Sequence, residues 1–312
     1  MTYDVLVIGG GPAGLTAALT LGRVRRSVLV LDSGEPRNAP AAGVHGFPTR
    51  DGLPPAELVA LTRAEAEVYG VRVERARVVG ARRAADGFEV TTAAGETFAA
   101  RRLLVATGLA DDLPDVPGVR ELWGRDVVHC PFCHGWEIRD TAIGVLGTGP
   151  MAVHQALLFR RMSADLTLFT HRSDPPTAEQ REQLDALGVT VVPGEVAGLV
   201  LRDDRLVGVR LTTGEVVPRT ALAVAPVMGT RADFLTDLGL PVEPHPMGSH
   251  VPADARGRAA DGVWLAGNAT DPAASVLIAA AEGATAAVAI HADLLEEDTR
   301  RAVEHHRRAL AG

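Results

Sequence analysis

Residues 5–14 read VLVIGGGPAG, an apolar run followed directly by a glycine turn. A helical pattern from Ala13 to about Arg23 comes next, and a second apolar run, residues 27–31, ends at Asp32. Continuous apolar runs are typical of parallel strands that are covered on both faces. The segment therefore predicts a strand–helix–strand unit of the kind that binds dinucleotides.

The spacing of the three glycines supplies the binding chemistry. Gly9 permits the tight turn, Gly11 lets a pyrophosphate approach the helix N-terminus, and Gly14 lets the helix pack closely on the strand. Asp32 stands 18 residues after Gly14, where a carboxylate accepts a hydrogen bond from a ribose hydroxyl. A glycine turn without a ligand is the alternative, but the ordered strand, turn, helix, strand and acid favour a binding site.

The same pattern occurs a second time. The turn Gly147-Thr148-Gly149-Pro150-Met151-Ala152 follows another apolar run and precedes a helix and an apolar strand, residues 166–170. Ala152 takes the place of the third glycine, and no acid ends the strand, which disfavours NAD. Arg172 suits a 2′-phosphate, whereas Asp174 repels one. We expect an α/β protein with two Rossmann-like dinucleotide-binding domains.

Length and charge narrow the class of protein. A chain of 312 residues predicts about two domains. All 31 basic residues are arginine, so Schiff-base and pyridoxal catalysis and the Walker phosphate loop, which need a lysine amine, are excluded. The net charge of −8 leaves no basic footprint for phosphate backbones, so nucleic acid is not an expected partner.

One stretch approaches the length of a membrane span. Residues 5–22 carry no charge, but glycines and a proline stand in their middle and no positive segment precedes them. We interpret the stretch as a buried strand and helix, and we expect a cytoplasmic protein with no membrane partner.

The two cysteines form the pair Cys130-Pro131-Phe132-Cys133. In a reducing compartment such a pair is a redox dithiol or half of a metal site. His129 and His134 would have to complete a zinc site, but ligands one residue from each cysteine strain tetrahedral closure, so no metal is predicted.

Four motifs in order resemble the low-molecular-weight thioredoxin reductases over nearly the whole chain. They are residues 9–14, Ala106-Thr107-Gly108, the cysteine pair, and the turn Gly267-Asn268. The resemblance implies a three-layer ββα fold and a homodimer. It also implies a discontinuous FAD-binding domain, residues 1–112 and 246–312, and an inserted NAD(P)-binding-like domain, residues 113–245, that carries the cysteines.

The resemblance also assigns site residues. It implies that Cys133 faces the flavin while Cys130 exchanges with the substrate. The residues that it implies for binding FAD are Gly9, Gly11, Pro12, Ala13, Gly14, Asp32, Arg37, Ala106, Thr107, Gly108, Gly267, Asn268 and Val276.

Two positions depart from the reductases, which carry acids there. His134 follows the second cysteine, where an imidazole can act as a base toward a thiol, unless it merely caps a turn. Asn268 follows the glycine of the C-terminal turn. If that turn meets the cysteine segment, the Asn268 amide could orient the imidazole, so we expect Cys130, Cys133, His134 and Asn268 to be catalytic.

The sequence Cys-x-x-Cys-His-Gly, beside an altered nucleotide site, is similar to the dithiol oxidases of gliotoxin- and holomycin-type pathways. That similarity implies an FAD-dependent oxidase that closes a disulfide in a small natural-product dithiol and passes electrons to O2, giving H2O2. Three alternatives stay open: an NADPH-dependent thioredoxin or disulfide reductase, a ferredoxin-driven reductase, and a flavin-bearing redox sensor. Phe47, Phe132 and Trp136 are candidates for lining the substrate pocket.

Overall fold

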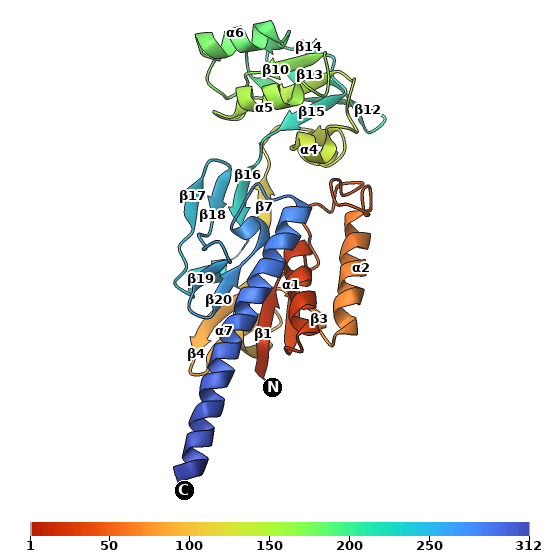
Figure 1. Ribbon diagram of the computed structural model, residues 1–312. Coiled ribbons are helices and arrows are strands. Elements are labelled where there is room, and N and C mark those ends of the chain that lie inside the picture. The colour runs from red at the N-terminus through yellow and green to blue at the C-terminus, as the bar shows by residue number, and fades with distance from the viewer. Residues whose placement is uncertain (1, 232, 312) are drawn as a thin grey trace. The chain divides into compact units, whose positions relative to one another are not determined.

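The computed structural model describes residues 2–231 and 233–311, drawn as a ribbon in Figure 1. The chain forms two compact units, and each is made of separate segments. The first comprises Met1–Ala39, Ala56–Ala110 and Met228–Gly312, and the second comprises Pro40–Pro55 and Asp111–Val227. Both units are thus discontinuous along the chain.

The boundaries differ from the expected ones in two places. Residues 228–245, expected in the inserted domain, lie in the first unit because Met228 pairs with Gly248 in a small sheet there. Residues 40–55, expected in the FAD domain, cluster with the second unit. Neither segment carries a sequence signal for its unit, because the contacts that place it are distant along the chain.

The first unit is built on an eight-stranded sheet with the order β19-β20-β6-β1-β2-β3 and a β4–β5 hairpin attached to β6. Strand β1 pairs in parallel with β2 and β6, and β20 pairs in parallel with β6. The strands are β1 (Thr2–Ile8), β2 (Val28–Asp32), β3 (Arg72–Arg75), β4 (Val78–Ala84), β5 (Gly87–Thr92), β6 (Thr97–Val105), β19 (Arg258–Ala260) and β20 (Val263–Leu265).

Two helices of the first unit, α1 (Pro12–Arg23) and α7 (Val276–Ala311), lie side by side (Figure 1). Gly283 allows the two helices to pack closely, because any larger residue there would place its Cβ against the carbonyl oxygen of Ala13. By length and composition α7 is the one described helix that could span a membrane. Several of its alanines, with Ile290 and Leu294, are buried in the core around α1, so α7 is a core helix here.

A helix, two 3-10 turns and a small sheet are the remaining elements of this part of the chain. They are helix α2 (Pro55–Val68), the 3-10 turns η1 (Asp233–Leu235) and η2 (Gly267–Ala269), and a sheet of order β17-β18-β16-β7. Its strands are β7 (Leu109–Asp112), β16 (Val227–Thr230), β17 (Glu243–His245) and β18 (Gly248–His250). The chain passes from one compact unit to the other at β7 and β16.

The second unit repeats the parallel architecture. Its sheet has the order β11-β10-β9-β15-β8, and every pairing in it is parallel. The strands are β8 (Val127–Val128), β9 (Ile143–Leu146), β10 (Leu166–Phe169), β11 (Thr190–Val192) and β15 (Ala221–Val224). All residues of β9, β10 and β15 are buried, as expected for strands covered on both faces.

Short helices and an antiparallel sheet complete this unit. The helices are α3 (Val119–Leu122), α4 (Pro131–His134), α5 (Ala152–Phe159) and α6 (Ala178–Ala186), and the sheet consists of β12 (Val196–Arg202), β13 (Arg205–Leu211) and β14 (Val216–Val217). A capping box between Thr177 and Gln180 starts α6. The predicted α/β fold class with two dinucleotide-type units is confirmed.

Candidate active site: a dinucleotide cradle and a redox disulfide

The turn between β1 and α1 has the geometry of a phosphate cradle. Gly9 has φ +109° and a side chain there would overlap the carbonyl oxygen of Ala106, while a side chain at Gly14 would overlap the carbonyl oxygen of Gly9. Both positions therefore require glycine. Gly11, the N-cap of α1, has no heavy atom within 4 Å of an added Cβ, so open space adjoins the helix N-terminus.

Asp32 and Thr107 provide polar groups for a bound dinucleotide. Oδ1 of Asp32 accepts a hydrogen bond from the Gly10 backbone N–H at 3.0 Å, which fixes the carboxylate beside the glycine turn. Thr107, next to the end of β6, has a buried hydroxyl without a hydrogen-bond partner in the described chain. A buried hydroxyl without a partner is costly, and a ligand oxygen would satisfy it. These residues fit a dinucleotide cofactor.

The C-terminal turn lies in the same unit. Gly267 has φ +74°, and its N–H donates to Glu282 Oε2 at 2.7 Å. Burial raises the pKa of Glu282, against the opposing effect of that hydrogen bond. The turn leads into α7, whose first residue is Val276, so this predicted FAD residue stands at a helix N-terminus.

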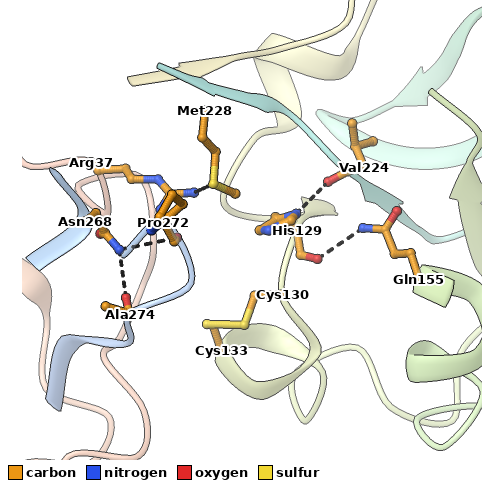
Figure 2. The surroundings of a disulfide bond; sticks show 10 residues. All are labelled: Arg37, His129, Cys130, Cys133, Gln155, Val224, Met228, Asn268, Pro272 and Ala274. Atoms are coloured by element: carbon orange, nitrogen blue, oxygen red, sulfur yellow. Dashed lines mark hydrogen bonds between the residues drawn. A yellow bond between two sulfur atoms is a disulfide. The ribbon is translucent and has the colours of Figure 1, made fainter. Parts of the chain in front are cut away.

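Asn268 uses its amide group to close this turn, as Figure 2 shows. Its Nδ2 donates to the carbonyl oxygens of Asp271 at 3.0 Å and Ala274 at 2.9 Å. His134 belongs to the other compact unit, so the expected pairing of Asn268 with the imidazole stays a prediction. Arg37, also predicted to bind FAD, lies with its Nη2 3.5 Å from Met228 Sδ (Figure 2).

Cys130 and Cys133 form a disulfide in the second unit (Figure 2). Cys130 is the N-cap of the single-turn helix α4, and its carbonyl oxygen accepts hydrogen bonds from the N–H groups of Cys133 at 3.2 Å and His134 at 3.0 Å. This turn brings the two Cα atoms to 5.3 Å, a separation that a disulfide spans.

The residue before the pair is tied to the sheet. A ring nitrogen of His129, Nδ1, lies 3.2 Å from the carbonyl oxygen of Val224 in β15, and Gln155 of α5 donates to the His129 carbonyl oxygen at 3.2 Å (Figure 2). These contacts anchor the residue that precedes Cys130, so the His129 side chain and backbone have a structural role. In the described part of the chain, no group of three or more His, Cys, Asp or Glu side chains could hold a metal ion.

His134 is the last residue of α4 and directly follows Cys133. Both ring nitrogens are buried and neither has a hydrogen-bond partner among the described residues, so the imidazole does not cap a turn. Burial lowers the pKa of His134, Glu137 acts in the opposite direction, and His45 adds to the lowering. The ring is therefore neutral at pH 7, with one nitrogen able to accept a proton.

A cavity of about 510 Å³ adjoins the disulfide within the second unit, lined by His45, Asp51, Pro131, Phe132, Cys133, Trp136 and Glu137. Phe132 and Trp136 are in its wall as expected, but Phe47 is not among the lining residues. Of the two cysteines it is Cys133 that lines the cavity.

Three residues of the wall, His45, Asp51 and Glu137, escaped sequence reasoning. The first two stand more than 80 residues before the third, and no motif links them. A histidine between two acids indicates a possible binding site only after the fold has brought the three residues together.

The second glycine turn presents a different set of groups. Its one candidate for a 2′-phosphate, Arg172, is paired with Glu195 at 3.3 Å. The neighbouring His171 is occupied as well, because its Nδ1 accepts a hydrogen bond from the Val196 N–H at 3.0 Å. A phosphate at this place would have to displace Glu195 from the guanidinium.

Comparisons with known proteins agree with the two units and the disulfide. Residues 3–289 match the family model described as pyridine nucleotide-disulphide oxidoreductase. The chain is similar to thioredoxin reductase sirT of Leptosphaeria maculans, 31% identical over 313 residues and covering 95% of each chain. It is 40% identical to thioredoxin reductase tcpT of Claviceps purpurea (strain 20.1) over 185 residues, 56% of this chain and 58% of that protein.

A solved structure is similar over almost the whole length. The crystal structure of HlmI has a TM-score of 0.94 and 44% sequence identity, and the match covers 99% of this chain and 98% of that one.

Proposed function

The chain belongs to the pyridine nucleotide-disulphide oxidoreductase family and is an FAD-dependent oxidoreductase, and from this premise we propose that it is a dithiol oxidase. Its substrate would be a small natural-product dithiol in which it closes an intramolecular disulfide, with O2 as the electron acceptor. One observation carries the proposal: His134 directly follows the redox pair, and its two ring nitrogens are buried and have no hydrogen-bond partner in the described chain.

The proposed exchange begins with a proton transfer. His134 removes a proton from one substrate thiol, because the thiolate and not the thiol is the nucleophile. The thiolate attacks the disulfide at Cys130, a new substrate–Cys130 disulfide forms, and Cys133 leaves as a thiolate. The second substrate thiol loses its proton to the solvent, and the resulting thiolate attacks the substrate sulfur of the mixed disulfide and releases Cys130 as a thiolate. Two electrons have then passed from the substrate to the cysteine pair.

Bound FAD would supply the two-electron chemistry that links the reduced cysteine pair to O2, with H2O2 and the restored disulfide as products. The residues that would hold it are those of the first glycine turn, with Asp32 and Thr107, and the turn at Gly267 that precedes α7. Cys130 and Cys133 are restored as a disulfide after each cycle, so the protein turns over without a nicotinamide.

The order of attack at the two sulfurs is part of the proposal. The resemblance assigns the substrate to Cys130, whereas Cys133 is the cysteine that lines the cavity. Attack at either sulfur gives the same net transfer of two electrons.

A pyridine nucleotide-dependent disulfide reductase is the second candidate, favoured by the names of the relatives sirT and tcpT. The pairing of Arg172 with Glu195 speaks against it, because NADPH recognition relies on free cations at the 2′-phosphate. The resemblance to thioredoxin reductases also supports a homodimer in the cytoplasm, which we include in the proposal.

Turnover in air tests the function. The purified flavoprotein is mixed with excess dithiothreitol, and oxidised dithiothreitol and H2O2 are counted. We expect one H2O2 per disulfide over many turnovers without NADPH. A single flavin equivalent followed by no further reaction would indicate a redox sensor, and a strict requirement for NADPH would indicate a reductase.

A further inference from the structure

Two solvent-exposed aromatic side chains form part of the wall of the cavity beside Cys133. Phe132 is 83% exposed and Trp136 is 69% exposed, an unusual placement for large aromatic side chains next to a reactive disulfide. Trp136 is nevertheless fixed in position. The Arg139 guanidinium lies over the indole ring, 4.0 Å from the centroid, and donates to the Trp136 carbonyl oxygen. The indole is thus a preorganised flat contact surface.

Three polar side chains also line the cavity. His45 lies between two carboxylates, with Nδ1 3.3 Å from Asp51 Oδ2 and Nε2 3.4 Å from Glu137 Oε1. The Gly46 N–H donates to Asp51 Oδ1 at 2.8 Å, and this bond together with His45 lowers the pKa of Asp51. Asp51 is therefore a carboxylate at neutral pH.

The charge of the lining follows from these residues. Two carboxylates and one imidazole line the cavity, and no arginine is among the lining residues. The Arg139 guanidinium stacks on Trp136 and is not part of the lining. Carboxylate oxygens accept N–H donors and repel anions.

The volume limits the kind of occupant. About 510 Å³ lies within the range of roughly 300–1,000 Å³ that is usual for small-molecule sites. A folded protein partner would instead contact a broad surface. The chemistry of the wall, flat aromatic surface on one hand and hydrogen-bond acceptors on the other, suits a compact ring system that carries amide or amine N–H groups.

We propose that this cavity is the substrate-recognition site and that it selects small, neutral or cationic dithiols with a flat apolar part and N–H donors, while Asp51 and Glu137 reject anionic dithiols. The direction of electron flow in this inference rests on the proposed function, but the recognition itself does not. Phe132 and Trp136 are then the apolar contacts, and Asp51, His45 and Glu137 determine charge specificity.

The test measures the first step alone, reduction of the Cys130–Cys133 disulfide in the holoprotein under anaerobic conditions. Three 1,4-dithiol probes, each able to close a six-membered cyclic disulfide, differ mainly in charge: cationic 2-amino-1,4-dimercaptobutane, neutral dithiothreitol and dianionic 2,5-dimercaptoadipate. Samples are quenched with an alkylating reagent, and free thiols are counted by mass spectrometry. Each rate is divided by the same dithiol's rate toward bis(2-hydroxyethyl) disulfide in solution, which removes intrinsic thiol reactivity.

We expect normalised rates that fall from the cationic to the anionic probe by on the order of tenfold, and less so at high salt. The double variant D51N/E137Q should remove most of this preference. The matched control is Glu182→Gln, which neutralises an exposed carboxylate on α6 in the same unit and should leave the preference unchanged.

The aromatic wall needs its own probe. Neutral 1,2-benzenedimethanethiol carries a flat ring, and dithiothreitol does not. W136A should lower the rate with the aromatic dithiol by roughly threefold to tenfold relative to dithiothreitol, and W136F should restore most of it. Because Trp136 is largely exposed, its replacement removes little buried area and should leave folding intact.

Equal normalised rates for the cationic, neutral and anionic probes, or a preference that persists in D51N/E137Q, would overturn the inference. Faster reduction by reduced thioredoxin than by every small dithiol would also overturn it. A charge preference in this first step supports the inference even if no H2O2 forms in air. The absence of H2O2 would contradict only the oxidase function, so a failure of the proposed function can be distinguished from a failure of this inference.

Discussion

The chain contains two glycine turns of the same design, and the polar groups around them differ. In the first, Asp32 accepts a hydrogen bond from Gly10 and open space adjoins Gly11. In the second, the cation that remains, Arg172, is paired with Glu195. The parallel sheet is present in both units, which teaches that packing preserves the scaffold while a few polar side chains decide binding.

The glycines themselves show the same distinction. A side chain at Gly147 would clash with Ser173 Oγ and with the carbonyl oxygen of Thr170, so the close chain packing alone requires glycine there. Gly149, like Gly11, has no heavy atom within 4 Å of an added Cβ. A glycine motif is therefore partly a packing requirement, and its presence in the second unit does not establish a ligand.

The largest expected effect is the loss of dithiol turnover when either cysteine of the pair is replaced. If the second unit acts through its disulfide, C130S and C133S should each abolish dithiol turnover, since neither serine can form the exchanging disulfide. In each variant the remaining thiol can hold a mixed disulfide with an added substrate disulfide. Mass spectrometry of that adduct shows which cysteine the substrate reaches, and full turnover in either variant would contradict the disulfide route.

His134 is expected to have the next largest effect. H134N should lower kcat/KM for a dithiol by on the order of 100-fold to 1,000-fold because general-base catalysis is lost. The neutral imidazole is the active form, so wild-type activity should be lost as the pH falls through the lowered pKa of His134, below the ordinary value of about 6.5.

The pH profile separates this role from a structural one. In H134N the acid-side inflection should disappear while the disulfide and the flavin absorbance remain. An unchanged inflection in the variant would assign the proton transfer to another group.

The two turns can be compared directly by matched substitutions. G11V should weaken FAD binding by on the order of a hundredfold, because the branched side chain fills the space that a pyrophosphate needs. G149V, the same change in the second turn, should leave both the bound flavin and dithiol turnover unchanged. The ratio of flavin to protein absorbance after gel filtration measures the first effect. Loss of dithiol turnover in G149V would mean that the second turn still binds a required ligand.

The smallest expected effect on dithiol turnover comes from replacing Arg172, the cation beside the second glycine turn. R172M should change dithiol turnover by less than about twofold, because an exposed ion pair contributes little. E195Q frees the guanidinium and should strengthen binding of a 2′-phosphorylated adenine nucleotide, followed by calorimetry. A large loss of dithiol turnover in R172M would restore a functional role to this site.

The parts of the molecule that sequence could predict depend on short-range patterns. The first glycine turn, Asp32 and the cysteine pair are contiguous motifs whose spacing follows from strand, turn and helix geometry. The flavoprotein assignment follows from the order of these motifs, and the comparisons confirm it.

The parts that escaped prediction depend on contacts between distant residues. His45 meets Glu137 only because the segment around it packs within the second unit, and Glu195 reaches Arg172 across 23 positions. The Asn268 amide N–H groups are bonded to carbonyl oxygens of its own turn, which the sequence did not indicate, while its pairing with the imidazole stays a prediction. Side-chain pairing of this kind has no local signature.

The most direct test of the account compares two reductants of the flavin under anaerobic conditions. The holoprotein is mixed in a stopped-flow instrument with a small dithiol or with NADPH, and the flavin absorbance is followed before air is admitted. We predict fast bleaching by the dithiol, little or none by NADPH, and release of H2O2 when O2 enters. Fast bleaching by NADPH with none by the dithiol would contradict the account, because it would show that the second turn is a working nucleotide site in a reductase.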